Sequence, residues 1–103
     1  MTKKILGSLL ALTMLASPLY AEKVKVGFMT TLSGPAGIIG KQMKDAFQLG
    51  LDHIGKAFGG MESSVIYGDD QRKPDVAKQL ADKMVKKHQV HFVTGVIWSN
   101  LLV

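Results

Sequence analysis

The chain contains no cysteine among its 103 residues. Disulfide bonds, thiolate nucleophiles and cysteine–zinc sites are therefore excluded. Arginine is almost absent too, because Arg72 is the only one, and the lysines are scattered along the expected helix faces. A nucleic-acid surface needs clustered Lys and Arg, often with aromatic residues between them. We therefore interpret the positive charge as ordinary solvated surface and expect no nucleic-acid partner.

Recognisable catalytic and metal-binding spacings are also missing. His53, His88 and His91 fall in separate elements without an HExxH-like spacing, and no serine lies in a GxSxG context. Residues 30–40 contain GxxGxxG, which matches neither the dinucleotide loop nor the phosphate loop. In the only adjacent carboxylate pair, Asp69-Asp70, neighbouring extended residues point to opposite sides, which favours a solvated acidic turn over a metal site. We expect no catalysis, no cofactor and no metal.

Residues 1–21 have the order of a secretory signal peptide. Lys3 and Lys4 form a basic start, residues 5–16 are dominantly apolar, and small or tolerated residues lead to Ala21. The apolar run is about a dozen residues, short of the roughly 20 needed to span a bilayer. We expect export with cleavage after Ala21; the resemblance described below implies that the destination is the periplasm. Cleavage removes two of the 13 basic residues and lowers the net charge from +5 to +3.

The remaining segment, residues 22–103, alternates strand and helix patterns. The expected strands cover residues 24–29, 64–67 and 91–95, and the expected helices cover about 39–58 and 74–88. Gly59-Gly60 is a natural helix stop, and Pro74 suits a first helical position. Helices that alternate with strands imply parallel pairing, so the fold class is α/β with a doubly wound sheet.

Each expected helix has one apolar face at steps of three and four residues. For the first helix the face comprises Met43, Phe47, Leu51, Ile54 and Phe58. For the second it comprises Val76, Ala77, Leu80, Ala81, Met84 and Val85. We expect these side chains to pack against the two faces of the sheet.

Two loops are candidates for ligand binding, because ligands of open α/β sheets bind at the carboxyl ends of strands. Residues 30–40 offer hydroxyls and backbone N–H groups at a helix start, which suit an uncharged polar or anionic group. Trp98, Ser99 and Asn100 follow the third strand in the same way. Ser99 could instead simply cap the next helix. Trp98 could line a cleft or pack in the core.

Three segments resemble the amino-terminal part of periplasmic solute-binding proteins of ABC transporters, in the branched-chain amino acid-binding family with the type I periplasmic-binding fold. They are VKVGFMTTLSGPAGIIGKQMKDAFQLGLD, YGDDQRKPDVAKQLADKMVKK and VHFVTGVIWSN. The most specific pieces are LSGPxxxxG, DDxxxPDxA and GxxxS. The resemblance implies two α/β lobes around a cleft, a carboxylate-bearing small solute as ligand, and delivery of that solute to an ABC permease in the inner membrane. It also implies the absence of catalysis.

Members of that family are several times longer, so the resemblance implies that residues 22–103 are the incomplete first lobe. Carried over to this sequence, the first-lobe ligand contacts fall on Ser33, Gly34, Trp98, Ser99 and Asn100. Ile39 stands where amino-acid binders often carry an aromatic residue. This departure favours an aromatic or other small organic acid alongside amino acid-like ligands.

Two other classes of protein remain possible on this sequence. A sensory ligand-binding ectodomain of a receptor could use the same fold, and a transmembrane segment after the second lobe would identify it. An exported enzyme with a flavodoxin-like sheet is the third hypothesis. Loss of activity on changing Asp69 or Ser99 would support that enzyme.

Overall fold

The computed structural model describes residues 23–102, so the predicted signal peptide lies outside the described residues. The strands are β1 (Val24–Thr30), β2 (Ala57–Phe58), β3 (Met61–Asp69) and β4 (Phe92–Thr94). The helices are α2 (Gly37–His53), α3 (Pro74–Lys86) and the 3-10 helix η1 (Ser99–Leu101). No helix within this described part is long and apolar enough to cross a membrane.

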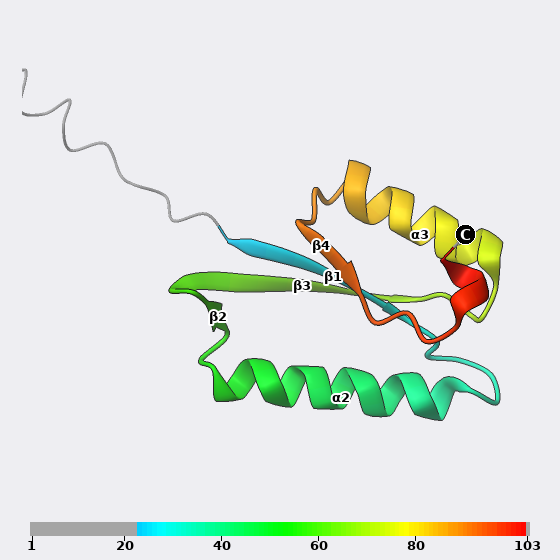
Figure 1. Ribbon diagram of the computed structural model, residues 1–103, viewed down its shortest axis with the longest axis horizontal. Helices are drawn as coiled ribbons and strands as arrows, with labels where there is room; N and C mark the ends of the chain where they lie inside the picture. Colours follow the sequence, from blue (N-terminus) through cyan, green and yellow to red (C-terminus); the bar gives the residue numbers. More distant parts are fainter. Residues whose placement is uncertain (1–22, 103) are drawn as a thin grey trace, which may run out of the picture.

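The four strands form one sheet in the order β2-β3-β1-β4. The strand β1 pairs in parallel with β3 on one side and with β4 on the other, while β2 pairs antiparallel with β3. The helices α2 and α3 lie on opposite sides of this sheet (Figure 1). The arrangement confirms the expected doubly wound α/β architecture, including the helix start at Pro74.

The central strand β1 is buried on both faces from Val26 onward, because helices cover both sides of it. Toward α2, the ring of Phe28 lies with its centroid 4.7 Å from that of Phe47. Toward α3, Met29 packs with Met84 and its neighbours in the main apolar cluster. Alternate side chains of a strand point to opposite faces, so one strand serves both layers.

The first helix ends earlier than its apolar spacing predicts. The prediction of a helix to residue 58 was wrong, because α2 stops at His53. Gly55 then adopts φ +68°, and the N–H of Lys56 donates to the carbonyl of Leu51 at 2.7 Å, which closes the helix end. Ala57 and Phe58 form β2 instead, and the following two glycines make the turn into β3.

The two expected apolar faces are only partly buried. On α2, Leu51 is buried while Met43 and Phe47 are half-buried. Ile54 is 50% exposed, because it lies beyond the helix end. On α3, Val85 was wrongly assigned to the buried face and is 55% exposed, whereas its neighbour in the sequence is buried.

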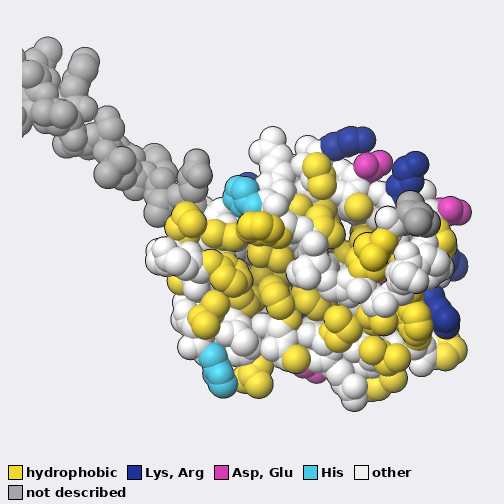
Figure 2. Space-filling model, viewed as in Figure 1, with side chains coloured by type: hydrophobic (Ala, Val, Ile, Leu, Met, Phe, Trp, Pro, Cys, Tyr) yellow, Lys and Arg dark blue, Asp and Glu magenta, His cyan; other side chains and the backbone are white. Residues whose placement is uncertain are grey.

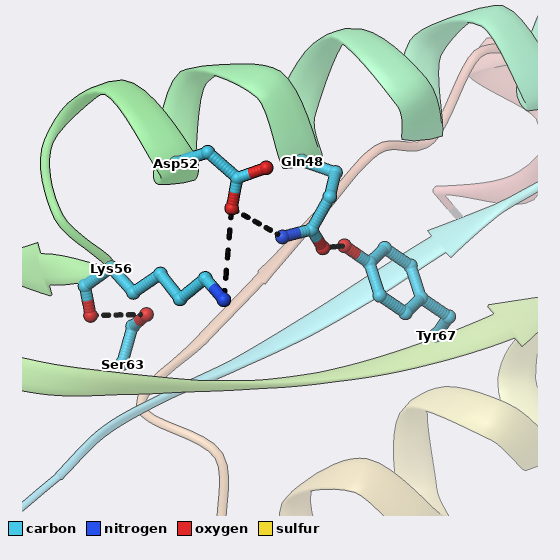
Figure 3. A network of polar contacts seen from close by, with 5 residues as sticks. All are labelled: Gln48, Asp52, Lys56, Ser63 and Tyr67. Atoms are coloured by element: carbon cyan, nitrogen blue, oxygen red, sulfur yellow. Dashed lines mark hydrogen bonds and ion pairs between the residues drawn. The ribbon is translucent and has the colours of Figure 1, made fainter.

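A polar network joins α2 to β3 on the α2 side of the sheet (Figure 3). The hydroxyl of Tyr67 donates to Gln48 at 2.8 Å, and the amide of Gln48 donates to Asp52 at 3.2 Å. The ammonium of Lys56 pairs with the carboxylate of Asp52 at 3.9 Å. The backbone carbonyl of Lys56 accepts a hydrogen bond from the Ser63 hydroxyl at 2.8 Å. Burial and the charge of Asp52 raise the pKa of Tyr67, which keeps the phenol protonated as the donor.

Apolar side chains gather on the face that carries β4 (Figure 2). The β4 edge is open, and Phe92 is 63% exposed. Beside it lies a groove of about 480 Å³ lined by Val24, Val26, Phe47, Phe58, Met61 and Phe92. Edge strands and contiguous apolar patches of this kind favour association with other elements. This groove is therefore a packing surface with no polar group to orient a small ligand.

Two glycines let the start of α2 pack directly on the loop that follows β1. A Cβ on Gly40 would collide with the carbonyl of Thr31, and one on Gly37 would lie 2.9 Å from the carbonyl of Leu32. The second and third glycines of the GxxGxxG pattern thus serve helix-to-loop packing, whereas an added Cβ on Gly34 would meet open space. The close approach holds the helix start against the carboxyl end of β1.

We predict that Gly40→Ala destabilises the protein by about 1–3 kcal/mol, because the added methyl group forces the helix away from the loop. Gly50→Ala is the matched control. Gly50 lies in the same helix with nothing within 4 Å of an added Cβ. That change should stabilise by about 0.5–1 kcal/mol through helix propensity. Urea denaturation measures both, and equal effects of the two substitutions would contradict the packing argument.

Candidate functional site

Three loops meet at one edge of the sheet. Because β1, β3 and β4 run in parallel, their carboxyl ends lie together, and each is followed by a loop. The loops cover residues 31–36, 70–73 and 95–98. The lining of the apolar groove described above includes the first residues of β1, β3 and β4, which lie at the other end of these strands. The polar candidates for ligand binding are therefore separate from that groove.

Asp70 is the buried centre of this edge, with no exposed surface. Its Oδ1 accepts a hydrogen bond from the hydroxyl of Thr31 at 2.6 Å and one from the backbone N–H of Arg72 at 2.8 Å. Its own N–H donates to the carbonyl of Thr30 at 3.0 Å. The expectation of a solvated acidic turn was wrong, because Asp70 joins the loops after β1 and β3.

Asp69 holds the loop that contains Ser33. Its Oδ1 accepts from the N–H of Leu32 at 2.8 Å and from the N–H of Gln71 at 2.9 Å. Burial alone would raise the pKa of Asp69. Hydrogen bonds from the hydroxyl of Ser33 and from the backbone of Leu32, Gln71 and Ser33 outweigh it and hold the pKa below its ordinary value. The candidate contact Ser33 is thus oriented by an ionised carboxylate.

The turn after β3 is strained and is held by the same two carboxylates. Gln71 and Arg72 have φ of 54° and 56°, in the left-handed region that non-glycine residues rarely adopt. Each accepts this conformation while its N–H donates to the aspartate two residues earlier. Such turns are a known property of Asp side chains. This turn places the Arg72 side chain beside Trp98 of the third loop.

Trp98 brings the third loop into the same cluster. Its indole Nε1 donates to the hydroxyl oxygen of Thr31 at 3.1 Å. The guanidinium carbon of Arg72 lies 4.1 Å from the centroid of the indole ring, a cation–π contact. Trp98 also packs against the apolar cluster that includes Met29 and Leu101. Packing in the core is therefore confirmed for Trp98, whereas its contact with a ligand stays a prediction.

The remaining candidates surround this cluster. Ser33 and Gly34 are exposed in the first loop, where Gly34 takes φ +71°. Ser99 and Asn100 are exposed at the start of η1. The structure thus places these residues at the ends of two adjacent strands. Ile39 lies in the first turn of α2 and is 42% exposed.

Ser99 does not act as a helix cap, which corrects one expectation. The cap position of η1 is Trp98, and no side chain caps it. The hydroxyl of Ser99 is therefore not committed to the helix start. Among residues 23–102, no group of three or more His, Asp or Glu side chains is placed to hold a metal ion.

The family profile of the periplasmic binding proteins matches residues 23–102. The chain belongs to this family. The match covers all three loops and every candidate residue, so the cluster at the carboxyl edge lies within the family's own fold.

Individual relatives of this periplasmic binding protein chain agree with that assignment. The Leu/Ile/Val-binding protein homolog 6 of Brucella abortus is 33% identical over 96 residues, 92% of this chain. A substrate-binding protein of an ABC transporter from Sphaerobacter thermophilus is 31% identical with a TM-score of 0.74, over 78% of this chain and 22% of its own. A solute-binding protein from Rhodopseudomonas palustris, solved in complex with 3,4-dihydroxybenzoic acid, is 30% identical with a TM-score of 0.66, over 69% of this chain and 20% of its own.

The chain spans about a quarter of the length of the curated relatives it matches, 25% for the Brucella protein. The shared part is therefore the strand–helix–strand–helix–strand unit described above and its three loops.

Sequence reasoning found the loops after β1 and β4 and missed the three residues that tie them together and to the loop after β3. Thr31, Asp70 and Arg72 were not assigned to the site. The available signal was the Asp pair at the end of a strand, before a helix that starts with proline, because that position places carboxylates at the sheet edge. The partners of these carboxylates are distant in sequence, so their roles appear only in the folded chain.

The lowered pKa of Asp69 predicts loss of stability in acid. A carboxyl whose pKa is lower in the folded state contributes stability above its unfolded value of about 3.9. That contribution disappears as the pH falls through the lower folded value. We expect the melting temperature to drop between about pH 5 and pH 3, and to drop less in Asp69→Asn. Identical profiles for the parent and Asp69→Asn would refute the assignment.

Proposed function

We propose that this chain is the amino-terminal part of the first lobe of a solute-binding protein that serves an ABC importer outside the cytoplasm. In this proposal residues 1–21 direct export and are removed, and residues 22–103 supply one side of a ligand cleft. The loaded protein then presents its solute to a permease in the inner membrane. The protein binds and delivers the solute without chemical change.

One observation carries the proposal. Two loops with exposed hydroxyl, amide and backbone N–H groups lie at the ends of the adjacent strands β1 and β4, and the Thr31–Trp98 hydrogen bond holds them together. This is the position at which open α/β sheets bind ligands. Ser33 and Gly34 on one loop, and Ser99 and Asn100 on the other, are the proposed polar contacts.

The proposed ligand is a small carboxylate-bearing molecule, either amino acid-like or an aromatic acid. Hydroxyls and backbone N–H groups are suitable donors to a carboxylate. The Brucella relative is called a Leu/Ile/Val-binding protein homolog, and the Rhodopseudomonas relative was solved with 3,4-dihydroxybenzoic acid. Ile39 and Trp98 are the proposed apolar contacts. Arg72 already lies over the indole of Trp98, so the ligand would meet only the remaining surface of the ring.

Removal of a proposed donor should weaken binding by the complete two-lobe protein. We expect Ser99→Ala to raise Kd by about 10- to 100-fold, because a hydrogen bond to a charged group contributes about 1.5–3 kcal/mol. The hydroxyl of Ser33 already donates to Asp69, so Ser33→Ala should raise Kd by releasing the loop that this hydrogen bond holds. Calorimetric titration with leucine, isoleucine and 3,4-dihydroxybenzoate measures this.

Ser63→Ala is the matched control for the two serine substitutions. Its hydroxyl donates to Lys56 in the β2–β3 hairpin, at the far end of the sheet. This change should leave Kd unaltered. If the parent protein binds none of these solutes or other small organic acids, the proposed function is wrong. If it binds one and neither loop serine matters, the proposed contacts are wrong.

The isolated segment should not bind solute usefully. A polypeptide limited to residues 22–103 provides one side of the proposed cleft, whereas the contacts to an amino group would come from the second lobe. We expect no Kd below about 1 mM, the range that corresponds to roughly 4 kcal/mol. Ligand-observed NMR on that polypeptide tests this, and a submillimolar Kd would contradict it.

A further inference from the structure

We propose that the hydroxyl of Thr31, held by Asp70, is a positioning group that makes the two ligand loops a single rigid unit. Thr31 would touch no ligand. It would act by holding Trp98, and through Trp98 the loop that carries Ser99 and Asn100. The inference rests on the proposed function for its consequence in binding, but the coupling of the loops is a property of the free protein.

The hydroxyl of Thr31 uses both of its roles at once. It donates to Oδ1 of Asp70 at 2.6 Å and accepts from Nε1 of Trp98 at 3.1 Å. A hydroxyl has one donor proton and two lone pairs. Because the Thr31 proton is donated to Asp70, the lone pairs of the Thr31 oxygen remain to accept from the indole N–H. The carboxylate of Asp70 therefore determines the donor-to-acceptor direction of both hydrogen bonds. Neither bond forms if the side chain at position 31 lacks a hydroxyl.

Arg72 closes the cluster from its other side. Its backbone N–H donates to Oδ1 of Asp70, and its guanidinium lies over the indole ring of Trp98. Asp70 is thus linked indirectly to Trp98 of the third loop in two ways, through the hydroxyl of Thr31 and through Arg72. A shift of any one loop must break a contact with another. Loops joined in this way move together rather than independently.

Burial distinguishes this cluster from polar side chains that are solvated at the surface. Thr31 is 1% exposed and Asp70 is fully buried. Oδ2 of Asp70 has no hydrogen-bond partner among the described residues. A buried carboxylate destabilises a protein unless it is well paired, and two adjacent residues also hold strained positive φ angles. Local strain and a buried polar group that is only partly hydrogen-bonded are typical of positions where orientation matters for function.

Hydrogen exchange of the ligand-free protein tests the coupling directly. In Thr31→Val, which keeps the shape but removes the hydroxyl, we expect amide exchange to rise at least tenfold both at Leu32 and at Leu101, whose N–H groups are hydrogen-bonded in the first and third loops. Residues 63–66 of β3 should be unchanged. The indole N–H resonance of Trp98, identified by its loss in Trp98→Phe, should shift. Faster exchange confined to Leu32 would overturn the proposal.

The neighbouring residue provides a matched control. Thr30 is also buried, and its hydroxyl has no partner among the described residues. Thr30→Val should therefore leave the exchange of both loops and the indole resonance unchanged. Thr31→Ser keeps the hydroxyl and should restore the behaviour of the parent. A serine variant that behaves like valine would show that methyl packing, not hydrogen bonding, holds the loops, and would overturn the proposal.

Binding gives the second readout. With whichever of leucine or 3,4-dihydroxybenzoate the parent protein binds, Thr31→Val should raise Kd about tenfold while Thr31→Ser and Thr30→Val do not. Unchanged Kd despite loosened loops would overturn the role in binding. If the parent binds neither solute, the proposed function is in doubt, and the exchange result still decides whether Thr31 couples the loops.

Discussion

Parallel pairing on both sides of β1 is the constraint on which the rest of the structure depends. The register places Thr30 beside Asp69 of β3, and Phe28 beside Thr94 of β4. Each strand therefore ends at the same edge, and the residues that follow them are brought within hydrogen-bond distance. Without this register Asp70 could not reach Thr31, and Trp98 could not reach it from the other side. The candidate site therefore depends first on the alignment of the strands and only then on the identity of its side chains.

The edge is held by directional polar contacts rather than by apolar packing alone. Apolar burial stabilises a fold but specifies orientation weakly, whereas a hydrogen bond constrains both distance and angle. Asp69 and Asp70 together accept hydrogen bonds from residues of two loops and stabilise two backbone conformations that would otherwise be unfavourable. The helices supply the opposite kind of contact, with Met84 and Leu51 buried against the two faces of the sheet. Stability and geometry are thus provided by different parts of the same small unit.

Much of this fold follows from local sequence patterns, and most of the site does not. Apolar periodicity predicted the strand and helix order, and Pro74 marked a helix start, because these features depend on neighbours within a few residues. The end of α2 was missed because Ile54 and Phe58 continue the apolar spacing past His53, where the helix stops. The role of Asp70 could not be predicted, since its partner Thr31 is 39 positions away and the Thr31–Trp98 pair spans 67. The strand-and-loop pattern of the sequence located the two loops, and the resemblance named contacts in them; only the folded chain showed what joins them.

The close approach of Gly37 and Gly40 to the carbonyls of Leu32 and Thr31 also limits changes in the length of the loop between β1 and α2. The helix start and the strand end are pressed together, so the six residues between them have a fixed span. An insertion there would have to bulge outward without moving the helix. A deletion would pull the start of the helix away from the loop carbonyls that it contacts. In this loop, replacement of side chains at constant length is therefore the change that the packing tolerates best.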